Sequence, residues 1–468
     1  MLALFALSLT ALVCFAGCIS GPVIAPEQSS IPAVDATNTY SAVHTDPPAT
    51  AGQASAVPVT DVPATVEHTP EVTPVFPVDE YNIGPENGSA GRYIANVNDP
   101  ARELMTADEI ASANARMIKD CPALADIIDV PVEISGETLK NMMNGVSVPE
   151  QPLYDQNGKE ISEAAVEAIK ALMDADNIPE NAAVVPGIVV RRANLKRLPT
   201  ELEFHSFAGS NVDRIQDTEL YLGMPVWVLH YSADGKFAFV RSYYYSGWTK
   251  ADNIASAKSK EAWLEFADPE RYAVVTDARL DIYGIQADMG VKLPYVDIDG
   301  AGEFYTVKLP VRNQDGSLGS EQIKISVHSA HRGYLKYTYA NFIVQAFKFE
   351  GTMYSWGGLK EGVDCSSYVA SVMRPFGFLL PRDTKDQNYS VGTAVEISGM
   401  NEAEVRKAVT EAGNGVPLAL YTNGHVKFYI GLIDGVPMTI HAPGSNKTVK
   451  AEPLEQFGNI ISVRMLLG

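Results

Sequence analysis

Hydrophobic and polar positions follow a helical period in two segments of the first half of the chain. Over residues 106–121 the apolar residues recur at intervals of three and four and share one helical face. They are Ile110, Ala113, Met117, Ile118 and Cys121. Thr106 and Glu109 form a capping-box pattern at the start of this segment. A second helical pattern covers residues 162–178, so we predict a small helical domain over residues 91–186.

From residue 187 onward the helical period gives way to short alternating runs that are broken by turn residues. The stretch "PVWVLHYSADGKFAFVRSYYYSGWTK" predicts a hairpin around Asp234 and Gly235, followed by another strand. Further on, "RLDIYGI", "EFYTVKLPV" and "EQIKISV" belong to a second β-rich stretch. We predict two small β-barrels, one over residues 187–262 and the other over residues 263–337.

The last part of the chain, residues 338–468, begins with helical patterns and ends in strands. Within "YSWGGLKEGVDCSSYVASVMRPFG" the apolar residues after Cys365 recur at helical spacing, so this cysteine stands in the first turn of a predicted helix. The segment "PLALYTNGHVKFYIGLIDGVPMTIHAPG" is typical of a strand meander. Helices first and an antiparallel sheet second predict an α+β domain.

Length and charge narrow the class of protein. The 468 residues are enough for about three domains. The formal net charge of −21 argues against nucleic acid or an anionic membrane surface as the main partner, because both require an excess of Lys and Arg. After Cys18 the chain holds only Cys121 and Cys365, so no multi-bridge disulfide framework is expected. Cys121 is predicted to be a core residue.

The first residues predict export from the cytoplasm. The apolar run "MLALFALSLTALVCFAGC" over residues 1–18 resembles a bacterial lipoprotein signal, in which Cys18 becomes the lipidated first residue. An ordinary cleaved signal peptide or a short membrane anchor stays open as the alternative. Residues 19–90 are rich in Pro, Ala, Thr, Ser and Val, which predicts a disordered tether. We expect a protein of the periplasm or cell surface that meets the membrane only through its lipid anchor.

Cys365 is the candidate nucleophile. A helix N-terminus carries a partial positive charge, which favours a thiolate and predicts a lowered pKa for this thiol. Asp364 just before it could be only the N-cap of the helix. A thiolate nucleophile also needs an imidazole and a group that orients the imidazole. The meander that follows supplies His425 and His441.

The two histidines can meet only if the hairpin between them has the right register. A two-residue turn of Asp434 and Gly435 would pair position 441 with 428 and place the rings on opposite faces of the sheet. A three-residue turn of Ile433, Asp434 and a left-handed Gly435 would pair 441 with 427 and place both rings on one face. We predict the second register.

Several motifs occur in a fixed order along the last part of the chain. They are Tyr354, Trp356, Gly357 and Gly358; Asp364, Cys365 and Ser366; Leu380, Pro381 and Arg382; Gln387; Gly424, His425 and Gly431; and His441. This series resembles the motifs of the NlpC-type cell-wall cysteine peptidases, a papain-like family. Upstream, "RRANLKRLPT" and "GMPVWVLHYSADGKFAFV" resemble the bacterial SH3 module that precedes this catalytic domain, and "HRGYLKYT" resembles the junction from a second module.

The resemblance implies a multidomain fold class. A small helical N-terminal domain and two small SH3-like β-barrels would precede an α+β papain-like catalytic domain. The family members with this order of modules are γ-D-glutamyl-L-diamino acid endopeptidases similar to dipeptidyl-peptidase VI. They prefer stem peptides with a free L-Ala amine, and the neighbouring SH3 module helps to close that end of the cleft.

Carried over position by position, the resemblance implies roles for individual residues. Cys365 is the nucleophile, His425 the general base and acid, His441 the group that orients His425, and Tyr354 an aid to the oxyanion site. Asp364 and Ser366 match positions that bind the free α-amine of L-Ala. Arg382 suits the α-carboxylate of D-Glu, because its guanidinium is a planar fork. Thr384 and Trp356 also face substrate, although Trp356 could instead only pack beneath the helix.

The expected function is hydrolysis of peptidoglycan stem peptides at the γ-D-glutamyl-diamino acid bond, through a thioester on Cys365. No metal and no cofactor are expected, and a monomer is predicted because no coiled coil or repeat is evident. Two alternatives stay open. The protein could be a tethered peptidoglycan-binding protein without activity, or an amidase or acyltransferase on the same scaffold, which would not need Asp364 and Arg382 for an amino-terminal dipeptide.

Overall fold

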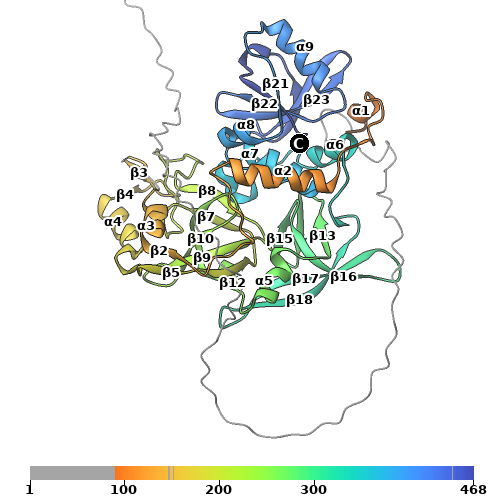
Figure 1. Ribbon diagram of the computed structural model, residues 1–468. Coiled ribbons are helices and arrows are strands. Elements are labelled where there is room, and N and C mark those ends of the chain that lie inside the picture. The colour runs from red at the N-terminus through yellow and green to blue at the C-terminus, as the bar shows by residue number, and fades with distance from the viewer. Residues whose placement is uncertain (1–89, 146–147, 151, 445, 468) are drawn as a thin grey trace, which may run out of the picture. The chain divides into compact units, whose positions relative to one another are not determined.

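The computed structural model of the protein describes residues 90–145, 148–150, 152–444 and 446–467 (Figure 1). The predicted signal peptide, with the lipidation site Cys18, lies outside the described residues, and so does all of the predicted tether except its last residue. Among the described residues, no helix is both long enough and apolar enough to cross a membrane.

The segment that precedes the large sheets contains helices and short strands. Its helices are α1 (Ala90–Ala95), α2 (Ala107–Asp120), α3 (Gly136–Asn144) and α4 (Glu163–Ala171), and its strands are β1 (Glu103–Met105), β2 (Glu133–Ser135), β3 (Leu153–Tyr154), β4 (Glu160–Ile161) and β5 (Asn181–Ala183). The predicted capping box of α2 is confirmed. The Thr106 hydroxyl accepts from the Glu109 N–H, and the Glu109 carboxylate accepts from the Thr106 N–H.

A seven-stranded antiparallel sheet, here called the first β domain (residues 185–256), follows with strand order β12-β6-β9-β10-β11-β7-β8. Its strands are β6 (Val185–Val189), β7 (Ala193–Lys196), β8 (Gln216–Leu220), β9 (Pro225–Tyr231), β10 (Phe237–Arg241), β11 (Ser246–Lys250) and β12 (Ile254–Ser256). The predicted hairpin at Asp234 and Gly235 joins β9 to β10 and is confirmed. Phe239 and Trp248 face each other across β10 and β11, with ring centroids 5.3 Å apart in the buried interior.

The second β domain (residues 272–332) is a five-stranded antiparallel sheet in the order β18-β17-β16-β13-β19, together with the separate hairpin β14–β15. Its strands are β13 (Tyr272–Val275), β14 (Arg279–Ile282), β15 (Ile285–Asp288), β16 (Lys292–Ile298), β17 (Phe304–Arg312), β18 (Leu318–Ser326) and β19 (Ala330–Arg332). Helix α5 (Lys260–Ala267) leads into it and packs Trp263 and Phe266 against Ile188 of β6.

The C-terminal domain has helices first and an antiparallel sheet second, as predicted. After the short strand β20 (Tyr337–Thr338), which pairs with β1, come α6 (Tyr339–Phe347), the 3₁₀ turn η4 (Trp356–Glu361), α7 (Cys365–Met373), η5 (Arg374–Phe376), α8 (Thr384–Ser390) and α9 (Glu402–Ala412). The sheet has the order β21-β26-β22-β23-β24-β25. Its strands are β21 (Thr393–Val395), β22 (Leu418–Thr422), β23 (His425–Ile433), β24 (Val436–His441), β25 (Lys450–Pro453) and β26 (Ser462–Met465).

Strand β22 shows how this sheet buries both of its faces. Ala419 and Tyr421 belong to the same core as α6 and α7, whereas Leu418 and Leu420 pack with α9. The alternation of side chains along a strand therefore distributes the meander between two helical layers. Figure 1 shows α9 on one side of this sheet and α7 on the other.

The helices of the N-terminal segment contribute to two different cores. The apolar face of α2, including Ile110 and Met117, lies in the core that contains α6 and α7. Helices α3 and α4 instead place Leu139 and Val166 in a core with Trp248 of the first β domain. The helices of this segment thus pack with two different parts of the protein, α2 with the C-terminal domain and α3 and α4 with the first β domain.

Two glycines let strand β8 approach the segment that leads into α7. Gly357 and Gly358 lie in η4 with positive φ angles of 60° and 70°. A Cβ atom on Gly358 would stand 2.1 Å from a carboxylate oxygen of Glu219, and one on Gly357 would stand 2.7 Å from the Gln216 side chain. The absence of side chains at these glycines thus allows the close approach. The Trp356 indole N–H donates to the Gln216 carbonyl oxygen at 3.1 Å, so the aromatic ring also contacts β8.

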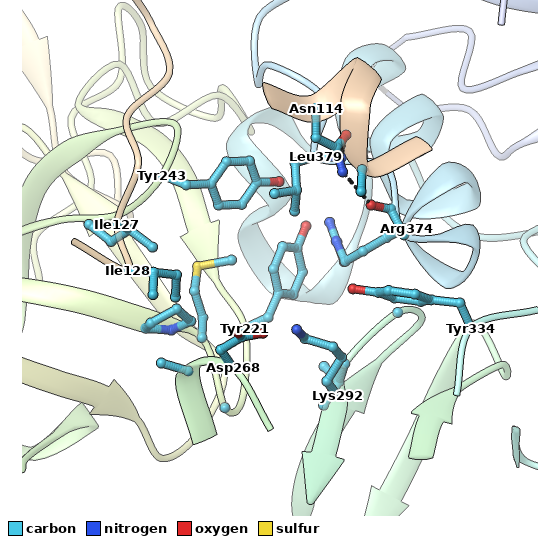
Figure 2. A pocket seen from close by; sticks show the side chains of 18 of the residues that line it. Asn114, Ile127, Ile128, Tyr221, Tyr243, Asp268, Lys292, Tyr334, Arg374 and Leu379 are labelled. Carbon is cyan, nitrogen blue, oxygen red and sulfur yellow. Dashed lines mark hydrogen bonds between the residues drawn. The ribbon is translucent and has the colours of Figure 1, made fainter. Parts of the chain in front are cut away.

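A cavity of about 320 Å³ lies where α2, the two β domains and the C-terminal domain meet. Figure 2 shows Tyr221, Lys292, Tyr334 and Arg374 around it. The Arg374 guanidinium stacks on the Tyr221 ring at 3.9 Å and donates to the Met289 carbonyl oxygen at 2.9 Å. Arg374 therefore ties the C-terminal domain to both β domains.

The glycine contact predicts a stability difference between two Gly→Ala variants. Gly358→Ala should lower the free energy of unfolding by roughly 2–5 kcal/mol, because backbone strain at positive φ is joined by a clash with the buried Glu219. Gly284→Ala is the matched control, since Gly284 also has positive φ (85°) but no atom near the added Cβ. It should cost only about 1–2 kcal/mol. Equal losses of unfolding free energy for the two variants, measured by urea denaturation, would show that β8 shifts to accommodate the added methyl group.

Candidate active site

Cys365 is the first residue of α7, and Asp364 is the N-cap of this helix. The Asp364 carboxylate accepts from the Ser367 N–H at 2.9 Å, and the Ser367 hydroxyl accepts from the Asp364 N–H at 2.9 Å, so the predicted cap is confirmed. The Cys365 side chain is a free thiol and is buried. Gln387 donates to the Ser366 carbonyl oxygen at 3.0 Å and fastens the first turn of α7 to α8.

Asp364 and Arg382 form a buried bidentate ion pair. The two terminal nitrogens of Arg382 lie 3.1 and 2.6 Å from the two carboxylate oxygens. Arg382 also donates from Nε to the Thr218 hydroxyl at 2.7 Å and from Nη1 to the Ser366 hydroxyl at 3.1 Å. A carboxylate oxygen of Glu219 lies 3.8 Å from Nη2. Burial alone would raise the pKa of Asp364, but the charge of Arg382 lowers it below its usual value.

These contacts bear on the substrate roles predicted for Asp364, Ser366 and Arg382. Both oxygens of Asp364 already accept from Arg382, and the guanidinium points at protein oxygens and is buried. Contact with substrate therefore stays a prediction for the three residues. The structure shows them as a network that joins the start of α7 to strand β8 of the first β domain.

The hairpin that joins His425 to His441 has a two-residue turn, and the predicted three-residue turn was wrong. Position 433 pairs with position 436, so Asp434 and Gly435 alone form the turn. Both have positive φ angles, 52° and 78°, as a type I′ turn requires. This turn matches the right-handed twist of the flanking strands, which is why a two-residue Asp-Gly loop is favoured here.

A bulge within β23 restores the predicted register at the histidines. The pairing of β23 with β24 shifts between Tyr429 and Leu432, where Gly431 has a φ of 96°. On the far side of this bulge position 428 pairs with 440, which places 441 opposite 427. His425 and His441 therefore share one face of the sheet, and that part of the prediction is confirmed.

His425, His441 and Glu452 form a hydrogen-bonded chain. His425 Nε2 lies 2.7 Å from His441 Nδ1, and the two rings are nearly perpendicular with centroids 4.9 Å apart. His441 Nε2 lies 2.8 Å from a carboxylate oxygen of Glu452. The sulfur of Cys365 accepts a hydrogen bond from the Val426 N–H, which places it against β23 next to His425.

The local environment favours the neutral forms of the thiol and the imidazole. Burial and the nearby Asp364 carboxylate raise the pKa of Cys365. Burial, His441 and Lys427 together lower the pKa of His425 to about 3. The lowered thiol pKa predicted from the helix N-terminus was therefore wrong in direction, because burial and a carboxylate outweigh the helix dipole.

Comparison with known proteins identifies two domains in the chain. The NlpC/P60 family matches residues 351–460, which hold Cys365, His425 and His441. Residues 351–460 form an NlpC/P60 domain. The SH3 domain family of the SH3b1 type matches residues 203–250, within the first β domain. The resemblance to NlpC-type peptidases with an SH3 module is thereby confirmed, while the second SH3-like module and the helical domain stay predictions.

Named relatives of the chain are peptidases. A gamma-D-glutamyl-L-lysine dipeptidyl-peptidase of Bacillus cereus is 25% identical over 46% of this chain and 62% of its own length. The probable endopeptidase NlpC of Escherichia coli is 33% identical over 20% of this chain and 61% of its own length. The chain thus spans less than two thirds of either relative. A solved NlpC/P60 endopeptidase from Photobacterium damselae subsp. piscicida shares the fold, with a TM-score of 0.62 over 80% of this chain and 94% of that chain at 19% identity.

Three further residues were predicted to face substrate, and the structure places one of them, Thr384, against Cys365. The Thr384 hydroxyl lies 3.5 Å from the Cys365 sulfur, so Thr384 stands in the site itself. Tyr354 is half-buried, and its backbone N–H donates to the Lys447 carbonyl oxygen at 2.7 Å. Trp356 contacts β8 through its indole N–H. The substrate contacts predicted for the three side chains stay predictions.

Sequence reasoning missed the residues that the first β domain and β25 bring to the neighbourhood of Arg382 and His441. Asp217 and Glu219 lie two residues apart in β8, and both carboxylates are buried. Two acids in a strand of a small barrel, where apolar residues are expected, were the signal that could have indicated them. Glu452 carried no such signal, because "KAEP" resembles an ordinary exposed strand.

The raised thiol pKa predicts how Cys365 reacts in the free enzyme. Its alkylation by iodoacetamide should be slow at neutral pH and should accelerate as the pH rises above 9, because the thiolate is the reactive form. Rates would be measured by mass spectrometry between pH 5 and 10 in a Cys121→Ala background, which removes the other cysteine of the described residues. A fast, pH-independent rate between pH 5 and 8 would instead indicate a preformed thiolate–imidazolium pair.

Proposed function

We propose that the protein is a peptidoglycan hydrolase that cleaves the γ-D-glutamyl-diamino acid bond of stem peptides with a free N-terminal L-Ala. The hydrogen-bonded pair of His425 and His441 beside the Cys365 thiol supports cysteine peptidase chemistry. The name of the Bacillus cereus relative supports the bond, since that protein is a gamma-D-glutamyl-L-lysine dipeptidyl-peptidase. The preference for a free amine rests on a cluster of acidic side chains around Asp383, the residue before Thr384.

The reaction begins with a neutral thiol. His425 takes the proton of Cys365 as the sulfur attacks the γ-carbonyl carbon, and it gives this proton to the leaving amine of the diamino acid. The resulting thioester on Cys365 is hydrolysed by water that His425 deprotonates, which releases L-Ala-D-Glu and restores the thiol. The Cys365 backbone N–H at the start of α7 is a suitable donor to the oxyanion, and we propose Tyr354 as an aid to this site.

An acidic cluster at one end of the site carries the proposed preference for a free amine. Asp383, the N-cap of α8, precedes Thr384 and accepts from the Tyr245 hydroxyl at 3.2 Å. Asp217 of β8 belongs to the same cluster, because the charge of Asp383 helps to raise its pKa. Arg197 donates to Asp217 at 2.8 Å, so two carboxylates and one guanidinium leave one net negative charge.

Asp383 gives this cluster an edge at solvent-accessible space, whereas the Asp217 carboxylate is buried. A groove of about 560 Å³ is lined by Tyr245, Asp383 and Asp386. An ammonium group at the cluster would balance the remaining negative charge, whereas an acylated L-Ala would leave it without a partner. The carboxylates of Asp217 and Asp383 would add to the amine site predicted at Asp364, whose own carboxylate accepts from Arg382.

Product analysis tests the proposed bond and the amine preference together. The purified protein would be incubated with L-Ala-γ-D-Glu-diaminopimelate and with its N-acetylated form, alongside Cys365→Ala. We expect L-Ala-D-Glu from the free-amine peptide only, and none from the variant. Cleavage of both peptides at equal rates would contradict the amine preference. Binding of cell-wall material without cleavage would instead favour a non-catalytic binding protein.

Asp217→Asn should raise the KM for the free-amine peptide by roughly 10- to 100-fold with a smaller change in kcat, because a charge-assisted contact is lost. Burial raises the pKa of Asp217 to about 6. In the unmodified protein the KM should therefore rise as the pH falls through about 6 and the carboxylate is neutralised. Asp252→Asn, at an exposed position of the same β domain, is the control. An unchanged KM with a reduced kcat would exclude this role.

A further inference from the structure

Glu452 is held on β25 behind His441. Its carboxylate oxygen Oε1 lies 2.8 Å from His441 Nε2, and Oε2 lies 2.5 Å from Lys450 Nζ. Strand β25 pairs with β24, where Thr439 is opposite Glu452, and the Thr439 hydroxyl donates to the Glu452 carbonyl oxygen at 3.3 Å. The pairing of β25 with β24 therefore fixes the backbone of Glu452, and contacts with Lys450 and His441 fix its carboxylate.

The chemistry of these contacts fixes where the ring protons lie. An ionised carboxylate can only accept, so the His441 Nε2 that faces Glu452 must carry a proton. In a neutral imidazole the other nitrogen, Nδ1, then has a lone pair. Because His441 Nδ1 lies 2.7 Å from His425 Nε2, that nitrogen of His425 must donate. His425 is left with a lone pair on Nδ1, the nitrogen that faces away from His441.

The opposite arrangement of the ring protons on the two histidines, here called the opposite proton order, would prevent His425 from acting as a base toward Cys365. If His441 carried its proton on Nδ1, it would donate to His425 Nε2, and the proton of His425 would sit on Nδ1. A nitrogen that already carries a proton cannot accept one from the thiol. Nothing in the contact between the two rings prefers one order over the other, so the preference must come from the group behind His441.

We propose that Glu452 is a positioning residue that sets the proton order of the histidine pair, so that His425 can act as a base toward Cys365. It also stabilises the positive charge that develops on the imidazoles when the thiol proton is transferred. This inference rests on the proposed cysteine peptidase function. Glu452 acts through His441 and has no contact with the sulfur among the hydrogen bonds of the described residues.

The charged groups that face the pair are Glu452, Lys450, Lys427 and Asp364. Hydrogen bonds from Lys450 and His441 lower the pKa of Glu452 against the opposing effect of burial, so the carboxylate stays ionised at neutral pH. Lys427 and Lys450 disfavour a positive charge on His441, whereas Glu452 favours one. Among these groups Glu452 is the acceptor in direct contact with the imidazole chain.

Glu452→Gln in the full-length protein tests the proposal. An amide can donate as well as accept, so both proton orders become available with nearly unchanged shape. We expect kcat to fall by roughly 10- to 100-fold with little change in KM, the range typical for loss of a group that orients a histidine. Glu455→Gln, at an exposed position three residues further on, is the matched control and should retain activity.

A double-mutant cycle separates positioning from a merely structural role. If Glu452 acts through His441, Glu452→Gln should have almost no further effect in a His441→Ala background. An equal loss of activity in both backgrounds would overturn the proposal. The urea midpoint of Glu452→Gln should equal that of the unmodified protein, because the side chain is about one third exposed and contributes little to the core.

Nitrogen-15 NMR of the histidine rings gives a measurement that needs no substrate. We expect protonated Nε2 and unprotonated Nδ1 on His441 in the unmodified protein, and a mixture of both forms in Glu452→Gln. A His441 protonated on Nδ1 in the unmodified protein would overturn the proposal even if the enzyme cleaves stem peptides. Failure to cleave any stem peptide, with the expected ring protonation, would instead count against the proposed function alone.

Discussion

The buried ion pair between Arg382 and Asp364 is the contact on which the geometry of the active site depends. Removing one partner of such a pair leaves an unpaired buried charge and costs about 3–5 kcal/mol. The pair is bidentate, and Arg382 extends it to Thr218 of the first β domain. Because Asp364 is also the N-cap of α7, this network fixes the first turn of the helix and with it the position of Cys365.

Burial and the Asp364 member of this pair explain why Cys365 rests as a thiol. Asp364 stands next to Cys365 in the chain, and its charge together with burial disfavours a thiolate. Burial likewise keeps His425 neutral. In the proposed reaction, charge separation is therefore deferred to the moment of attack, when the proton would pass from sulfur to His425. Such a reaction depends more on the orientation of His425, the proposed base, than on a preformed thiolate–imidazolium pair. The hydrogen-bonded chain of His425, His441 and Glu452 would provide this orientation.

Local patterns allowed the sequence to predict the helix that begins at Cys365, the capping box of α2 and the face shared by the two histidines. The hairpin turn was mispredicted because Gly431 was not recognised as the site of the extra residue, although its φ of 96° suits a glycine. The direction of the thiol pKa depends on burial, which no local pattern reports. The roles of Glu219 and Glu452 were not predicted for a related reason, since each residue meets its partner only through tertiary contacts.

Strand β8 carries one residue of the domain contact, Glu219, and one residue of the proposed amine site, Asp217. Glu219 lies beside Arg382 and Gly358, where it helps to hold the NlpC/P60 domain against the first β domain. Two residues earlier, Asp217 belongs to the acidic cluster proposed to bind the substrate amine. Since a strand transmits any shift along its backbone, a change that moves Glu219 away from the glycines also moves Asp217. The proposed recognition of the peptide end would therefore depend on domain docking, and a free NlpC/P60 domain would keep its cysteine and histidines but lose part of the proposed selectivity.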